Sequence, residues 1–218
     1  MPVSKWLEAE LRKSFFKRKP IQRIYNGVDT NIFHPLENTK DVLRKYGLEE
    51  KRYVVGVATI WSERKGFADY CRLARILAEK VSVVLVGLNK QQREEAKHYG
   101  IIGIERTDNV NELVAIYTGA SIVMNLSCEE TFGLTTVEGF ACGTPSIVYN
   151  TTASPELVTP ETGVVAEFGD IAGLANTVDQ LLSKEKPINA CRKHAIDNFN
   201  KEDRYQEYLA LYKRLLGR

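Results

Sequence analysis

Residues 128–145 read CEETFGLTTVEGFACGTP, and this stretch decides how the rest of the chain is interpreted. It places Glu130 and Glu138 eight positions apart across what we expect to be a loop followed by a helix. Glu130 then lies just before the helix, and Glu138 lies about one turn inside it. A helix N-terminus presents unpaired N–H donors and about half a positive charge, so it attracts anions. The donors here belong to the residues at the helix start: Phe132, Gly133, Leu134 and Thr135.

Two carboxylates flanking an anion-binding helix start indicate a ligand of mixed chemistry. A carboxylate suits neighbouring hydroxyls, because its two acceptor oxygens meet two O–H donors. The ligand would therefore be both anionic and polyhydroxylated, and a nucleotide diphosphate sugar is both. Taken singly, each glutamate has a simpler explanation, as a solvated charge or as an acid favoured near the positive end of the helix dipole.

The composition is that of a soluble globular protein. The chain has 218 residues, of which 44% are apolar and 27% are charged. A net charge of +2 gives no argument for nucleic acid as a partner. The four cysteines are widely spaced, which predicts reduced thiols in a cytoplasmic protein and neither a disulfide nor a metal site. No apolar run approaches the roughly 18 to 20 residues that a membrane-spanning helix needs.

Short apolar runs alternate with segments of helical spacing along most of the chain. Runs rich in β-branched residues predict strands buried on both faces, and their regular alternation with helices predicts a parallel sheet. The fold class is therefore α/β, a Rossmann-like, mostly parallel sheet with helices on both faces. The expected strands are 53–60, 81–86, 100–104, 121–126, 146–149 and 163–165, and the expected helices are 68–77, 91–98, 110–117 and 134–141.

The 128–145 stretch also resembles the E-x7-E signature of a large family of retaining glycosyltransferases. This is family 4 of the GT-B fold, the glycosyl transferases group 1, whose members have two facing Rossmann-like domains. The resemblance runs from about Ile21 to the C-terminus. It includes three further pieces in the family's order: residues 26–29 (NGVD), 64–66 (RKG) and 154–156 (SPE). It implies the C-terminal, donor-binding domain of such an enzyme.

The resemblance also suggests how the chain is divided. Residues 1–23, which we expect to be helical from Lys5 to Arg23, resemble the end of a missing N-terminal domain. Residues 24–198 would form the nucleotide-sugar-binding domain. Residues 199–218 would form an amphipathic helix that packs toward the missing domain.

The family's pattern assigns roles to the two glutamates. The second glutamate of the signature, here Glu138, would bind the ribose hydroxyls of the donor. The first would contact the transferred sugar near the reacting carbon, and a count of seven intervening residues selects Glu130 over Glu129.

Cations follow the first predicted strand, where α/β folds bind ligands. Lys65 and Arg64 would stabilise the departing diphosphate, a kind of charge stabilisation that is often the largest catalytic contribution. The family usually has Gly-Arg a few residues earlier, whereas residues 58–62 read ATIWS here. Arg64 is therefore either a replacement for that arginine or a solvent-facing side chain.

Loops after the second and third strands would meet the nucleobase. Gly87 would allow a close backbone approach, although a plain turn explains it equally well. Arg106 and Thr107 would border the base, and Asn109 or Asp108 is the expected N-cap of the following helix.

Other chemistries lack support in the sequence. The three histidines are scattered, and the chain contains no Asp-x-Asp, P-loop or G-x-G-x-x-G motif. We therefore expect neither a metal nor a cofactor. The expected partners are a nucleotide-sugar donor as substrate, a glycan or lipid-linked acceptor, and the missing domain, without which the chain would bind nucleotide but not transfer sugar.

Two alternatives remain open at this point. One is an epimerase or phosphorylase half with the same fold. The other is a noncatalytic module whose basic segment, Lys5 to Arg23, contacts a partner or the inner face of a membrane, since seven basic residues there accompany three aromatic ones.

Overall fold

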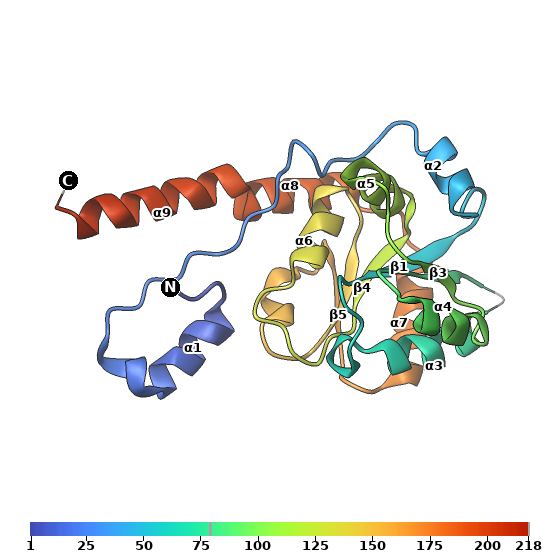
Figure 1. Ribbon diagram of the computed structural model, residues 1–218, viewed down its shortest axis with the longest axis horizontal. Helices are drawn as coiled ribbons and strands as arrows, with labels where there is room; N and C mark the ends of the chain where they lie inside the picture. Colours follow the sequence, from blue (N-terminus) through green and yellow to red (C-terminus); the bar gives the residue numbers. More distant parts are fainter. Residues whose placement is uncertain (79, 218) are drawn as a thin grey trace.

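The computed structural model describes residues 1–78 and 80–217, and these form an α/β body with a six-stranded parallel sheet (Figure 1). The strand order is β3-β2-β1-β4-β5-β6, with every neighbouring pair parallel. The strands are β1 (Tyr53–Val57), β2 (Ser82–Val86), β3 (Ile102–Ile104), β4 (Ile122–Asn125), β5 (Ser146–Tyr149) and β6 (Gly163–Ala166). The predicted fold class is thus confirmed.

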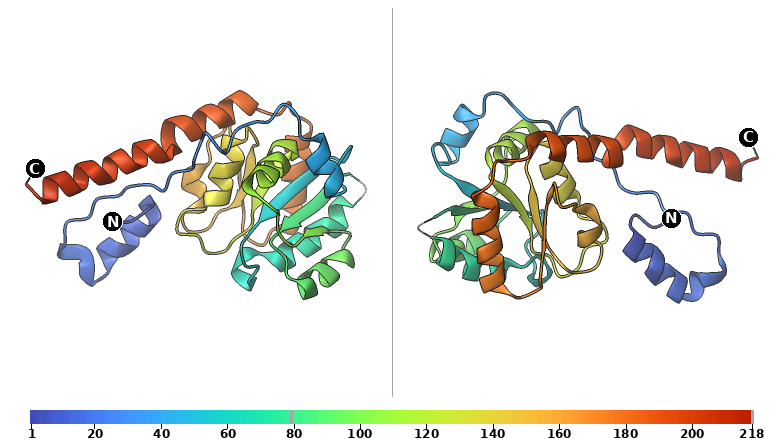
Figure 2. Two further views of the ribbon diagram at one scale, coloured as in Figure 1. Left: turned by 45° about the horizontal axis from the view of Figure 1, so that its top comes forward. Right: turned by 180° about the vertical axis from the view of Figure 1, so that it is seen from behind.

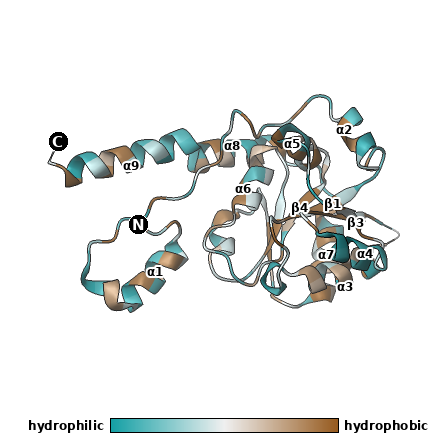
Figure 3. Cartoon of the chain, viewed as in Figure 1, coloured by the Kyte–Doolittle hydropathy of each residue, from teal (hydrophilic) through white to brown (hydrophobic). Residues whose placement is uncertain are grey.

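Helices cover both faces of the sheet, because its central strands are apolar on both sides. One face packs against α3 (Phe67–Leu77), α4 (Lys90–Lys97) and α7 (Ile171–Leu182). The other face packs against α5 (Val110–Gly119) and α6 (Leu134–Ala141), with α2 (Lys40–Lys45) and α8 (Ile188–Phe199) on their outer sides. Figure 2 shows these layers from two further directions. In Figure 3 the hydrophobic residues concentrate in the strands, whereas α4 is mostly hydrophilic.

The N-terminal segment differs from its prediction. The helix α1 (Lys5–Lys13) ends well before Arg23 and is followed by one 3-10 turn, η1 (Phe15–Arg18), and by extended chain. Ser14 explains the end, because its hydroxyl donates to the carbonyl of Leu11 and accepts from the amide of Phe16. The expectation of a continuous helix to Arg23 was therefore wrong.

Three helices were not predicted: α2, α7 and α8. The strand predicted over 53–60 ends at Val57, because Ala58 begins the loop that leaves the sheet edge. At the other end of the chain, α9 (Lys201–Leu215) forms where an amphipathic helix was expected, with Asn200 as its N-cap.

The junction of α8 and α9 is joined to residues 26–29. The amide of Val28 donates to the carbonyl of Phe199 (2.7 Å), and the amide of Lys201 donates to the carbonyl of Val28 (3.0 Å). The Lys201 ammonium also pairs with Asp29. In all three ribbon views α1 and α9 project from the same side of the α/β body (Figures 1 and 2). None of the described helices is both long and apolar enough to cross a bilayer.

Candidate functional site

Two neighbouring cavities lie at the carboxyl edge of the sheet, lined by the ends of β1 and β2 and by the loops that follow β3 and β4. Their volumes are about 400 and 420 Å³, and both are lined by residues 57–59. The strand order reverses direction at β1, and ligands of open α/β sheets bind at such a point.

The first cavity contains the start of α6. Gly133 is the N-cap of this helix and has a left-handed backbone (φ 104°), which glycine adopts readily. No side chain caps the helix, so its first N–H groups are available to a ligand. All four residues that we predicted here line the cavity: Phe132, Gly133, Leu134 and Thr135. The side chain of Phe132 is buried, so this residue faces a ligand through its backbone.

Lys65 and Glu130 meet in the same cavity. Lys65 Nζ lies 2.5 Å from Glu130 Oε1, and the Ser127 hydroxyl donates to the same oxygen from 3.0 Å. The amide of Glu130 donates to Thr152 Oγ1 (2.8 Å), which fixes the loop that carries the glutamate. The structure therefore brings a cation and a carboxylate together beside an uncapped helix start.

Arg64 takes a different position from Lys65. Its guanidinium pairs with Glu129 at 3.1 Å, and its side chain is 69% exposed. Arg64 and Glu129 line a third cavity of about 330 Å³, which borders the first one through Glu130 and Thr131.

Glu138 lies one turn further along α6, behind the residues that line the first cavity. Its Oε2 accepts a hydrogen bond of 2.8 Å from the hydroxyl of Tyr117 in α5. Burial raises the pKa of the Glu138 carboxyl above its ordinary value, and the Tyr117 hydrogen bond partly offsets this increase. A raised carboxyl pKa is typical of functional sites.

Tyr117 was not among the predicted site residues. In the sequence it appears only as the last apolar position of a predicted helix. Its contact with Glu138 spans two elements, so no local pattern could have indicated it.

The second cavity contains the residues predicted to border a base. Gly87, Arg106 and Thr107 line it together with the end of β2. Asn109 is the N-cap of α5, as predicted, and its side chain accepts from the amide of Glu112 at 3.1 Å.

Glu156 has a structural role that the sequence did not indicate. Its carboxylate accepts hydrogen bonds from the amides of Lys5 (2.8 Å) and Trp6 (3.2 Å) and from the hydroxyl of Tyr25 (2.9 Å). It therefore caps α1 and holds the N-terminal segment beside the site, where Trp6 lines the third cavity.

The described residues contain no group of three His, Cys, Asp or Glu side chains that could hold a metal ion. The positive charges at the site come instead from Lys65, Arg64 and the start of α6.

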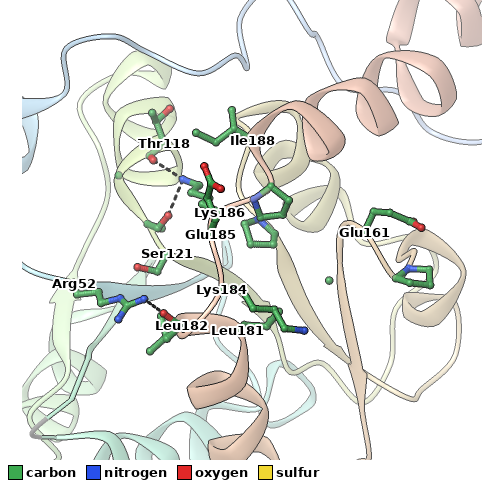
Figure 4. Close-up of a pocket in the computed structure, with 16 residues that line it drawn as sticks. Arg52, Thr118, Ser121, Glu161, Leu181, Leu182, Lys184, Glu185, Lys186 and Ile188 are labelled. Atoms are coloured by element: carbon green, nitrogen blue, oxygen red, sulfur yellow. Dashed lines mark hydrogen bonds between the residues drawn. The ribbon is translucent and has the colours of Figure 1, made fainter.

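A further cavity of about 490 Å³ lies at the opposite edge of the sheet (Figure 4). There Lys186 Nζ donates to the carbonyls of Thr118 (2.7 Å) and Ala120 (2.9 Å), at the C-terminal end of α5. Burial lowers the pKa of Lys186 to about 8. This lysine stabilises the end of the helix that carries Tyr117.

A family profile matches most of the chain. The profile of the family "Glycosyl transferases group 1" matches residues 38–198. The chain belongs to this family. Its resemblance to group 1 glycosyltransferases, inferred from the 128–145 stretch, is thereby confirmed.

Relatives within the family differ in what they act on. The chain is 27% identical over 227 residues to N-acetyl-alpha-D-glucosaminyl L-malate synthase of Bacillus anthracis, which covers 96% of this chain and 58% of that protein. It is 26% identical over 180 residues to the GDP-mannose-dependent alpha-(1-6)-phosphatidylinositol dimannoside mannosyltransferase of Mycobacterium tuberculosis, covering 79% of this chain and 47% of that protein. The chain thus spans about half the length of these relatives.

Solved structures share the fold. A glycosyltransferase from Rickettsia africae superposes with a TM-score of 0.86 at 21% identity, covering 98% of this chain and 62% of that one. Sucrose-phosphate synthase from Thermosynechococcus elongatus superposes with a TM-score of 0.85 at 24% identity, covering 99% of this chain and 58% of that one. Anabaena HepE in complex with UDP and glucose superposes with a TM-score of 0.83 at 18% identity, covering 98% of this chain and 62% of that one.

The raised pKa of Glu138 predicts a pH-dependent cost in stability. Below the ordinary pKa of glutamate, the carboxyl is neutral in both the folded and the unfolded chain. As the pH rises through the higher folded-state pKa, the buried carboxylate must ionise and the native state loses stability. The Glu138→Gln variant keeps an acceptor for Tyr117, so we expect it to be the more stable protein at pH 7, by a margin that shrinks toward pH 4.

Denaturant unfolding of both proteins between pH 4 and 8 measures this margin. The exposed Glu129→Gln variant is the control, for which only a small difference at any pH is expected. A Glu138→Gln margin that does not change with pH would contradict the assignment.

Proposed function

We propose that this chain is the donor-binding domain of a retaining glycosyltransferase of family 4. The observation that carries the proposal is the convergence, at one edge of the sheet, of an uncapped helix start, the Lys65–Glu130 pair and the half-buried Glu138. An anion and a set of hydroxyls are the ligand groups that such an arrangement would bind.

A nucleotide sugar would extend across the two cavities, from the second cavity to the first. Its base would occupy the cavity of Gly87, Arg106 and Thr107. Its diphosphate would reach the start of α6 and Lys65. Its ribose hydroxyls would be bound by Glu138, which lies one turn further along the same helix. The transferred sugar would then lie near Glu130.

The same groups explain how the glycosidic bond would be broken. Negative charge grows on the diphosphate as it leaves, and the α6 N–H groups and the Lys65 ammonium are positioned to stabilise it. Glu130 holds Lys65 beside the start of α6, so the cation would need little reorganisation when the donor binds.

Relatives support a donor and acceptor of these classes. One relative is named as GDP-mannose-dependent and acting on a phosphatidylinositol dimannoside, and another as a processive diacylglycerol glucosyltransferase. We extend this to a nucleotide diphosphate sugar as donor and a glycan or lipid-linked molecule as acceptor for the present chain.

We also propose a partner domain on the side of α1 and α9. The outer part of α9 exposes large apolar side chains that a second domain would cover: Tyr205, Leu209, Tyr212, Leu215 and Leu216. The length of the relatives agrees with an additional domain of about the same size.

Thermal unfolding with UDP, GDP or ADP tests donor binding. A ligand at about 100 times its Kd stabilises the native state by roughly 2.7 kcal/mol, which raises the Tm by several degrees for a chain of this size. We expect a shift with one of the nucleotides that Glu138→Ala abolishes and Glu129→Ala retains. A shift of equal size in Glu138→Ala, or none with any nucleotide, would count against the proposal.

Transfer activity tests the need for a second domain. We expect the chain to bind the nucleotide. We also expect that adding an acceptor will not increase the release of nucleotide from UDP-glucose or GDP-mannose, because the acceptor surface would belong to the partner domain. Nucleotide release assays with and without a methyl mannoside acceptor measure this. Acceptor-dependent release by the chain alone would disprove the need for the partner.

A further inference from the structure

The third cavity is a direct continuation of the proposed diphosphate site. It shares Glu130 and Thr131 with the first cavity, so a group attached to a diphosphate at α6 would lie next to it. Its volume of about 330 Å³ is at the small end of the range for ligand pockets, roughly 300 Å³. The remaining walls are Trp6, Arg64, Glu129 and Thr152.

Trp6 is held in this cavity by contacts far away in the sequence. Glu156 binds the amides of Lys5 and Trp6, and Tyr25 donates to the same carboxylate. Ser4, which is fully buried, caps the first turn by accepting from the amide of Leu7 at 3.1 Å. The first turn of α1 is thus bound by two side chains, Glu156 and Ser4, and this fixes the position of Trp6.

The polar residues that line the cavity are held by other contacts as well. Thr152 accepts from the amide of Glu130, and Glu129 is paired with Arg64. The walls therefore offer one aromatic side chain together with two carboxylates, a guanidinium and two hydroxyls.

This combination matches the chemistry of a sugar ring. A pyranose has faces rich in C–H groups, which pack on an aromatic surface, and an edge of hydroxyls, which bind carboxylates and guanidinium groups. Resting on the proposed function, we propose that the third cavity takes the transferred sugar of the donor and that Trp6 forms the wall against which the ring packs. Arg64 and Glu129 then bind sugar hydroxyls, and sugar specificity depends in part on the N-terminal segment.

Two indole signals make the proposal directly measurable. The chain contains two tryptophans, and the indole N–H of Trp61 is buried and donates to the carbonyl of Val86 at 2.9 Å. In proton–nitrogen correlation spectra, loss of one indole peak in Trp6→Phe assigns the Trp6 signal. We expect UDP-glucose, UDP-N-acetylglucosamine or GDP-mannose to shift the Trp6 signal, whereas UDP or GDP alone leaves it nearly unchanged.

Binding to variants provides the second readout. Calorimetry measures the Kd of both ligands. The Trp6→Ala variant should bind the nucleoside diphosphate with a Kd within about twofold of the wild-type value. Its Kd for the corresponding sugar nucleotide should be higher than the wild-type value by about fivefold or more. Trp6→Phe should restore most of the loss. Phe15→Ala is the matched control, since it removes an exposed aromatic side chain of the same segment outside the cavity.

The outcomes separate the two proposals. If the sugar nucleotide binds wild type and Trp6→Ala equally, or binds without moving the Trp6 signal, the sugar assignment is overturned while the donor-binding function stands. If neither nucleoside diphosphates nor sugar nucleotides bind the wild-type chain, the proposed function fails and the assignment fails with it.

Discussion

The close packing of α6 on β4 is the constraint on which the site depends. Gly139 faces Val123 at this contact, and a Cβ atom there would come within 2.6 Å of a Val123 methyl group. Because the helix lies directly on the strand, its N-terminus is held at the carboxyl edge of the sheet. Glu130 and Glu138 are placed by the same helix, one before its start and one on its second turn. Loosening this contact would displace the helix dipole and both carboxylates together.

A second feature is that the charged groups of the site are paired with other side chains. Lys65 is bound by Glu130, Arg64 by Glu129, and the carboxylate of Glu138 by Tyr117. These pairs hold each functional group in one orientation at some cost in stability, most clearly at Glu138, whose burial raises its pKa. Such preorganisation is what a site needs if its groups are to act on a developing charge without rearranging.

The sequence predicted the parts of the molecule that depend on local pattern. The buried strands were recognised because runs such as 81–86 consist largely of valine and leucine, and the helix start at Gly133 was recognised from its flanking acids. The helix α7 was not predicted although Asp170 caps it, because Gly173, Asn176 and Thr177 within it have low helix propensity. Contacts between distant elements were beyond sequence reasoning: Glu156 meets Trp6 across 150 positions, and Tyr117 meets Glu138 from a different helix. The early end of α1 depends on Ser14, whose side chain satisfies both neighbouring turns and removes the advantage of continuing the helix.

Together these features support the proposal that one helix start, one lysine and two glutamates bind the phosphates and hydroxyls of a single ligand. A crystal structure of the chain with bound UDP, GDP or ADP tests this most directly. The account predicts the terminal phosphate within hydrogen-bond distance of the Leu134 and Thr135 amides and of Lys65 Nζ, with the ribose hydroxyls on Glu138. A nucleotide bound at the opposite edge of the sheet, beside Lys186, or with its phosphates away from α6, would contradict it.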